Sequence, residues 1–437
     1  MQRLTRRNFL RALAGSVVGT SLIGGWSGAG WGQAVAPLTV GVLLNQSGST
    51  GTGENKLIEG IQLASDVINE QGGIAGRIPV KLVLEDGRFS PVEAVNGANR
   101  LVNRGDVGFV LGPLLSVQAL ATQPIFAAAG MAQIFFGSAE EFTQQHESAP
   151  LSLRYSVQTS IEMAPVAKYA VEVNQQKNFF VLAQNSDAGR SYAAALRAAL
   201  KQVGGSFIAD PEFYPAFNRD FATLMTRVKN SGADALLMGT GIPVEILGAL
   251  EAYERQGLNP DQVGFYGGIA LANENFFQHA GSTGRADGFI FPWIFDDGTD
   301  PRDFPRTKPA KQAITMTQAF IQRFGHPPTS EGQLTAWGWG GLQLISTAIT
   351  GLIAEQGADR LAGMKPVGEL PRAAIGYLLE GAAPDRPGRT LQTTFGDLGF
   401  FSCGQADILV GAATYKHGTR WLLRDRKWAQ ALVPPLC

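Results

Sequence analysis

The sequence contains few residues of the kinds that build metal centres. Its 437 residues include two cysteines and four histidines, and the histidines are scattered and lie near neither cysteine. A metal site is therefore not expected. The GxSxG, HExxH and CxxC patterns are also missing, so no motif supports a serine hydrolase, metalloprotease or thioredoxin function. We expect no catalytic residue, no metal and no cofactor.

Blocks of positive charge are also lacking after the first residues. The chain has 36 Lys and Arg against 37 Asp and Glu, with a formal net charge of -1. Without a basic stripe, neither nucleic acid nor anionic lipid is an expected partner. No segment after the N-terminus is long and apolar enough to suggest a membrane span.

The N-terminal stretch MQRLTRRNFLRALAG has four arginines and no acid, and the apolar run Ala12–Ile23 that follows is too short to cross a bilayer. Residues Thr5–Leu10 resemble the twin-arginine export motif, with a plain secretory signal or a retained anchor as alternatives. We expect residues 1–34 to be removed after Ala34, in the periplasm. A cut after Ala36 would place the poorly accepted Pro37 next. Loss of the four arginines changes the net charge from -1 to -5.

In an oxidising periplasm, Cys403 and Cys437 could form a disulfide that fixes the C-terminal tail. Closing a loop of this length stabilises a protein by about 3–4 kcal/mol. The alternative is two unpaired thiols.

Short apolar strands alternate with amphipathic helices along the first part of the chain. The first strand is expected at Leu38–Leu44, and its helix ends at Gly72–Gly73. Further strands are expected at Val80–Leu84, Val107–Leu111 and Ala132–Phe136. Strands that read as continuous apolar runs are typical of a parallel sheet covered on both faces by helices. The sequence thus predicts a doubly wound α/β lobe.

The same alternation restarts after Val157. NRGDVGFVLGP, which starts at Asn103, and NSGADALLMGT, which starts at Asn230, resemble one another and suggest one αβ unit used in two similar lobes. The strands expected in the second lobe are Phe179–Leu182, Phe207–Ala209, Ala235–Met238 and Val263–Tyr266.

After Gly288 the sequence is rich in proline and aromatic residues and then becomes helical. A late strand pair is expected at Ile408–Tyr415 and Thr419–Leu423. Trp337 and Trp339 are expected to pack a helix against a sheet rather than to stack on a ligand.

Small polar residues follow two neighbouring strands of the first lobe. Ser116 comes after the third strand, and Gly137-Ser138-Ala139 comes after the fourth. In open parallel sheets, ligands bind beyond the carboxyl ends of the strands, where helix N-termini present free N–H groups. Both places could bind one small carboxylate. The alternative is that both serines only cap their helices, and spacing alone does not decide between the two.

The mature chain resembles the type I periplasmic binding proteins of the leucine/isoleucine/valine-binding family, which are receptors for ABC importers. The resemblance is specific in DVINEQGGIAG at Asp66–Gly76, in the Ser90-Pro91 turn and in Gly112-Pro113. It implies a monomer that binds a small-molecule solute and works with a membrane permease. It also implies two doubly wound parallel-sheet lobes joined by three crossovers, near residues 155, 291 and 405. The lobes would span residues 35–155 with 291–405, and 156–290 with 406–437.

The resemblance assigns the ligand carboxylate to Ser116 and to the Gly137, Ser138 and Ala139 turn, while Thr52 of the first loop would help to shape the remainder of the site. The turn lacks the family's threonine hydroxyl, and Glu140-Glu141 follows it directly. An acid beside a carboxylate pocket repels an anion unless it points away or meets a cationic part of the ligand.

In the second lobe, Ala188 stands where the family has a tyrosine, and Gly241 or Ile242 stands where it has an aromatic residue. Ile269 replaces the acid that pairs with the ligand ammonium. Burial of an unpaired ammonium costs several kcal/mol. The resemblance therefore favours a small organic acid with an apolar or aromatic body over an α-amino acid.

Two other functions remain open from the sequence. Residues 48–53 have glycines spaced as in a P-loop, but Glu54 stands where the lysine must be. As a dinucleotide fingerprint this loop lacks its third glycine, whose place Lys56 takes, although Glu85 ends the second strand as a ribose-binding acid would. An exported NAD-dependent oxidoreductase is the enzymatic alternative, and the ligand-binding lobe of a sensory receptor is the other.

Overall fold

The computed structural model describes residues 36–47, 54–294, 310–328, 332–408, 410–424, 428–433 and 437. The expected export segment and the loop that holds Thr52 lie outside the described residues. The account below concerns residues 36–437, which form one compact unit.

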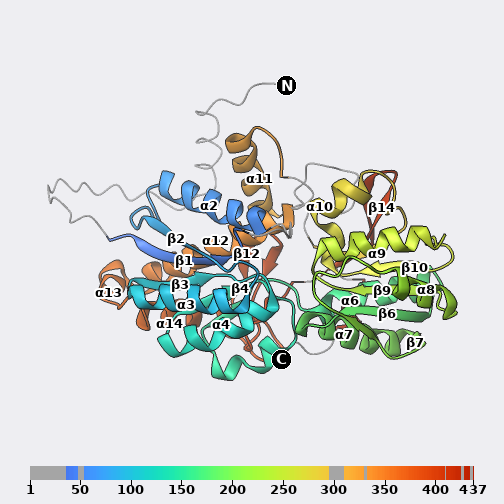
Figure 1. The fold of residues 1–437 in the computed structure, drawn as a ribbon. Coiled ribbons are helices and arrows are strands. Elements are labelled where there is room, and N and C mark those ends of the chain that lie inside the picture. The colour runs from blue at the N-terminus through green and yellow to red at the C-terminus, as the bar shows by residue number, and fades with distance from the viewer. Residues whose placement is uncertain are drawn as a thin grey trace. The chain divides into compact units, whose positions relative to one another are not determined.

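The first sheet has five parallel strands in the order β2-β1-β3-β4-β5 (Figure 1). Its order places β3 and β4 side by side, so their carboxyl ends lie at the same edge. The strands are β1 Leu38–Leu44, β2 Val80–Asp86, β3 Val107–Leu111, β4 Ala132–Phe135 and β5 Ser152–Arg154. Four were predicted, and β5 was not, because it is only three residues long.

Helices cover both faces of this sheet, as the continuous apolar strands predict. Consecutive strand residues point to opposite faces, and Val42 and Leu43 accordingly belong to different core clusters. Val42 shares its cluster with α2 (Glu54–Glu70) and α12 (Gly332–Gln356), and Leu43 shares its own with α3 and α4. Figure 1 shows α2 above the sheet and α3 and α4 below it. The bounds of the last two are Pro91–Arg104 and Ser116–Ala129.

The second sheet has eight strands, in the order β15-β14-β11-β10-β9-β6-β7 with β8 beside β6. It is parallel except for β14 and β15, which run antiparallel at one edge and correspond to the expected late strand pair. The strands are β6 Asn178–Gln184, β7 Ser206–Phe207, β8 Glu212–Tyr214, β9 Ala235–Gly239, β10 Gly264–Gly267, β11 Ile290–Trp293, β14 Gly411–Lys416 and β15 Thr419–Arg424. Together the two sheets confirm the predicted fold class.

Strand β11 was not predicted, because Pro292 lies inside it and proline argues against a strand in the middle of a sheet. It extends the second sheet to Trp293. The chain first leaves the five-stranded sheet after Arg154. There Gly404 and Ala406 run alongside it, with hydrogen bonds from Arg154 N to Gly404 O (2.8 Å) and from Ala406 N to Arg154 O (3.1 Å).

The remaining elements are helices that surround the two sheets and one small hairpin. The hairpin strands are β12 Leu391–Thr393 and β13 Gly396–Leu398. The helices are α5 Glu141–Gln144, η1 His146–Ser148, α6 Thr159–Lys168, η2 Tyr169–Val173, α7 Asp187–Val203, α8 Ala222–Asn230, α9 Pro243–Arg255, η3 Ile269–Ala272, α10 Glu274–Phe276, η4 Phe277–Gly281, α11 Lys311–Phe324, α13 Ala358–Ala362, α14 Glu369–Leu378 and η5 Gln430–Leu432.

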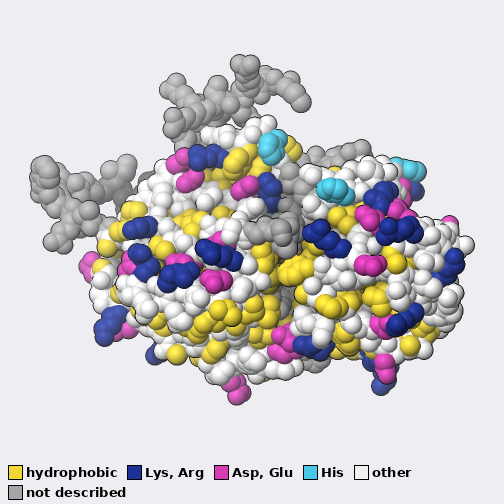
Figure 2. Space-filling view, viewed as in Figure 1, with side chains coloured by type: hydrophobic (Ala, Val, Ile, Leu, Met, Phe, Trp, Pro, Cys, Tyr) yellow, Lys and Arg dark blue, Asp and Glu magenta, His cyan; other side chains and the backbone are white. Residues whose placement is uncertain are grey.

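A disulfide joins Cys403 to Cys437, whose Cα atoms lie 5.6 Å apart. The bond ties the last residue to the segment that passes Arg154. No helix among the described residues meets the length and apolarity that a membrane span requires. On the face in view in Figure 2, basic and acidic side chains are interspersed rather than gathered by sign.

Two glycines bring α2 and α12 into backbone contact. A Cβ on Gly338 would lie 2.0 Å from Leu57 O, and a Cβ on Gly60 would lie 2.1 Å from Thr335 O. Because these neighbours are backbone atoms, no side chain can move aside to make room.

Gly338→Ala is expected to lower the free energy of unfolding by about 1–3 kcal/mol, because the two helices must separate. The matched control is Gly376→Ala at an exposed position of α14, where a Cβ meets nothing within 4 Å. This control should be neutral or stabilising by up to about 1 kcal/mol. Urea unfolding monitored by circular dichroism checks both, and equal effects would contradict the close helix contact.

Candidate functional site

One pocket is lined by loops and helices that follow strands of both sheets and by α12. It contains about 760 Å³ of space free of protein atoms, including its opening to solvent. The sequence-predicted residues that line it are Ser116, Ser138, Ala188, Gly241 and Ile269.

The hydroxyl of Ser116 joins the ends of β3 and β4. Its Oγ accepts hydrogen bonds from Ser138 N and Ala139 N, both at 3.2 Å, and the side chain is 6 % exposed. The residue before it, Leu115, is the N-cap of α4. Ser116 therefore links two strand ends at the pocket, and its own hydroxyl hydrogen remains available to donate.

This contact changes the role expected for the turn after β4. The amides of Ser138 and Ala139 are already bonded to Ser116, so here they position Ser116 instead of pointing free into the pocket. Gly137 and Ala139 are not among the lining residues. A Cβ on Gly137 would lie 3.1 Å from Ser116 Cα, so glycine allows the two strand ends to approach. Ala139 is buried beside Phe142.

Glu140 is bonded to another element. Its Oε1 accepts hydrogen bonds from Thr159 Oγ1 (2.9 Å) and Ser160 N (2.8 Å) at the start of α6. A helix N-terminus stabilises a carboxylate, and Glu140 is not among the lining residues. The acid that follows the turn is thus held by the N-terminus of α6.

Buried Arg154 lies near this turn, with its Cζ 5.3 Å from the ring centroid of Phe142. Burial lowers the pKa of Arg154 to about 10, although the charges of Glu140 and Glu141 oppose that shift. The guanidinium therefore remains charged at neutral pH and offsets the two acids.

Glu162 is a pocket residue that the sequence analysis did not find. It is 1 % exposed, and its Oε2 accepts hydrogen bonds from Tyr192 Oη (2.8 Å) and Ile269 N (3.0 Å). Burial raises the pKa of Glu162 to about 7, against the opposing effect of those two hydrogen bonds. One signal was available, because Glu162 is the only acid in the helix segment TSIEMAPVAK, every described residue of which is buried except the last. The pocket therefore has an acid, and it comes from α6 instead of the position of Ile269.

Helix α12 also contributes to the pocket. Trp337 and Gln333 line it, and their Nε1 and Oε1 atoms have no hydrogen-bond partner among the described residues. Trp337 therefore lines the pocket in addition to packing as predicted. Its ring centroid lies 6.3 Å from that of Phe395. Trp339 is buried in the core, as predicted.

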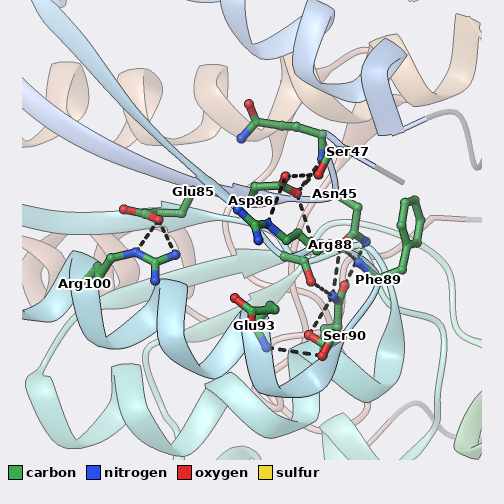
Figure 3. A network of polar contacts seen from close by, with 12 residues as sticks. Asn45, Ser47, Glu85, Asp86, Arg88, Phe89, Ser90, Glu93 and Arg100 are labelled. Atoms are coloured by element: carbon green, nitrogen blue, oxygen red, sulfur yellow. Dashed lines mark hydrogen bonds and ion pairs between the residues drawn. The ribbon is translucent and has the colours of Figure 1, made fainter. Parts of the chain in front are cut away.

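The ends of β1 and β2 are held by a separate polar network (Figure 3). Asp86 accepts hydrogen bonds from Gln46 N and Arg88 N, each at 3.0 Å, and from the Ser47 hydroxyl. Asn45 Oδ1 accepts one from Phe89 N at 2.7 Å. These bonds fix the loops that leave the two strands.

Two residues of this region do not fit a nucleotide site. Glu85 forms an ion pair with Arg100 of α3, with 2.7 Å between Oε2 and Nη2, so a ribose would have to displace the arginine (Figure 3). Glu54 is buried and accepts a hydrogen bond from Asn45 N at 2.6 Å. Among the residues with described positions, no group of three or more metal-ligating side chains is placed to hold a metal ion.

Ser116→Ala is expected to lower the free energy of unfolding by about 1–3 kcal/mol, because the amides of Ser138 and Ala139 lose their acceptor. Ser148→Ala, at an exposed position, is the control and should change it by less than about 0.5 kcal/mol. Chemical denaturation of both variants measures this. An unchanged midpoint for Ser116→Ala would show that the hydroxyl does not connect the strand ends.

The chain matches the family profile described as "Periplasmic binding protein" over residues 37–394. The Leu/Ile/Val-binding protein BraC3 of Rhizobium johnstonii is 27% identical over 290 residues, which are 66% of this chain and 75% of BraC3.

Solved structures share the fold. The substrate-binding protein LivJ of Streptococcus pneumoniae, in complex with isoleucine, has a TM-score of 0.71 at 19% identity and covers 89% of this chain and 100% of its own. A solute-binding protein of R. palustris in complex with 4-hydroxybenzoate has a TM-score of 0.70 at 18% identity, over 89% and 96%. The profile match, the relatives and the shared fold show that the chain belongs to the type I periplasmic binding proteins of the leucine/isoleucine/valine-binding family.

Proposed function

We propose that this chain is the periplasmic substrate-binding component of an ABC importer and that it binds a small organic acid without transforming it. Members of the family are solute-binding proteins that work with a membrane permease. We further propose that the solute binds in the pocket described above. We also propose that the chain is exported and that residues 1–34 are removed.

The observation that carries the proposal is the junction of Ser116 with the turn after β4. Its Oγ is held by two amides, which fixes the direction in which its hydroxyl hydrogen points. Ser138 lines the same pocket. Two hydroxyl groups held beside the start of α4 form a suitable end for a carboxylate, because the helix N-terminus favours negative charge.

The remaining wall suits an apolar body. Leu114, Phe136, Leu334 and Trp337 line the pocket, together with small residues of the second lobe. Lysine and arginine are missing from the lining among the described residues. Concave sites with mostly apolar walls and a few placed polar groups are typical of small-molecule binding.

The neighbours with bound solutes present two chemical classes. One binds isoleucine and another binds 4-hydroxybenzoate. The apolar residues Ala188, Gly241 and Ile269 support an acid without an ammonium group, since a small or aliphatic side chain replaces each polar or aromatic partner expected for an amino acid. Neither a nucleotide-dependent enzyme nor a sensory role receives support from the relatives.

Isothermal titration calorimetry on the chain from Val35 onward tests the solute class. Benzoate and 4-hydroxybenzoate are expected to bind with micromolar Kd, about -8 kcal/mol, and L-leucine at least tenfold more weakly. In Ser138→Ala the affinity for the benzoates is expected to fall about tenfold, the loss of one hydrogen bond to a charged group. Tight leucine binding with no binding of aromatic or short aliphatic acids would contradict the proposal.

A further inference from the structure

We propose that Glu162 takes part in solute binding in its protonated form and donates a hydrogen bond from Oε1 to the carboxylate of the solute. This inference rests on the proposed function, because it assumes an anionic solute. Capture would then take up one proton for each solute bound, to the extent that the free protein holds Glu162 ionised.

The two oxygens of Glu162 have different surroundings. Oε2 already accepts hydrogen bonds from Tyr192 Oη and Ile269 N, so two donors point at this oxygen. Oε1 is buried and has no hydrogen-bond partner among the described residues. A proton on this carboxyl therefore belongs on Oε1, which is the oxygen left for the contents of the pocket.

Among the described residues, no cation is one of the groups that shift the pKa of Glu162. The groups that act on it are Tyr192 from α7, the amide of Ile269 from η3, and Glu140 from the turn after β4, whose negative charge disfavours a second one. Arg154 of β5 interacts with Glu140 and Glu141 instead. An ionised Glu162 beside an anionic solute would be a pair of like charges in a buried site, and one of two such groups is driven to hold a proton.

Glu162 also lies near the end of the pocket assigned to the anion. The hydroxyl of Tyr192 binds Glu162, and Ser138 interacts with the same phenol. Glu162 and Ser138 therefore both interact with the hydroxyl of Tyr192, which places them at the same end of the pocket. Because burial raises the pKa of Glu162 to about 7, the proton can be gained or lost within the neutral range.

Glu162→Gln supplies the first test, because the amide keeps an acceptor for Tyr192 and Ile269 and places N–H donors where the protonated Oε1 would be. With 4-hydroxybenzoate as the probe, the affinity of the unaltered chain is expected to fall about tenfold between pH 6 and pH 8. Glu162→Gln should bind at all these pH values with little change. The control Glu147→Gln, at an exposed position, should keep the full pH dependence.

Two results would overturn the proposal. One is an affinity in the unaltered chain that does not fall with rising pH. The other is loss of binding in Glu162→Gln at every pH while that variant remains folded, which would indicate that an ionised Glu162 pairs with a cationic part of the ligand.

A second measurement needs no ligand. Since the folded-state pKa lies above the ordinary 4.5 of glutamate, the folded chain holds more protons between about pH 4.5 and 7, and its stability falls across that window as pH rises. Denaturant midpoints from pH 5 to pH 8 should show this fall to be steeper in the unaltered chain than in Glu162→Gln.

Parallel curves would show that Glu162 is ionised throughout and would overturn the proposal without any ligand. By contrast, absence of 4-hydroxybenzoate and benzoate binding at every pH, together with curves of different slope, would remove the proposed solute class and leave the proton on Glu162 supported. The failures of the two proposals are therefore distinguishable.

Discussion

The pocket depends on how two neighbouring strand ends are joined. β3 and β4 are adjacent and parallel, so their carboxyl ends lie side by side, and Ser116 Oγ accepts amide hydrogen bonds from the turn after β4. A glycine at residue 137 permits the approach. Because the hydroxyl is already an acceptor twice, its hydrogen is left for a third group. A structural contact thereby orients a donor towards the pocket.

The distribution of charge follows from the same junction. Glu140 follows the turn directly and accepts hydrogen bonds from the first residues of α6. Its carboxylate therefore stabilises the start of this helix, which follows the last strand of the first sheet. In the same first turn of α6, Glu162 lines the pocket and contacts Tyr192 and Ile269. A single short helix thus neutralises one acid with its N-terminus and presents another to the solute, which is the basis of the proposed proton-linked capture.

The sequence predicted the first sheet well, because its longer strands are rich in apolar residues and have helices between them. It failed where the strand signal is short or interrupted, as in the three residues of β5 and in β11, where Pro292 lies in the strand. Ser116 and Ser138 could be identified from their place after strands. Glu162 gave one signal, as the only acid in the segment TSIEMAPVAK. Its position at the pocket, like that of Trp337, results from contacts between segments far apart in the sequence. Thr52 stays a prediction outside the described residues.

The central claim is that the pocket captures a carboxylate between the Ser116–Ser138 junction and Glu162. The most direct measurement is a crystal structure of the chain purified under non-denaturing conditions, at a resolution that identifies the solute carried with it. The account predicts an organic acid whose carboxylate oxygens lie within hydrogen-bond distance of Ser116 Oγ and Glu162 Oε1. A solute bound with an ammonium group against Glu162, or one bound away from these side chains, would contradict it.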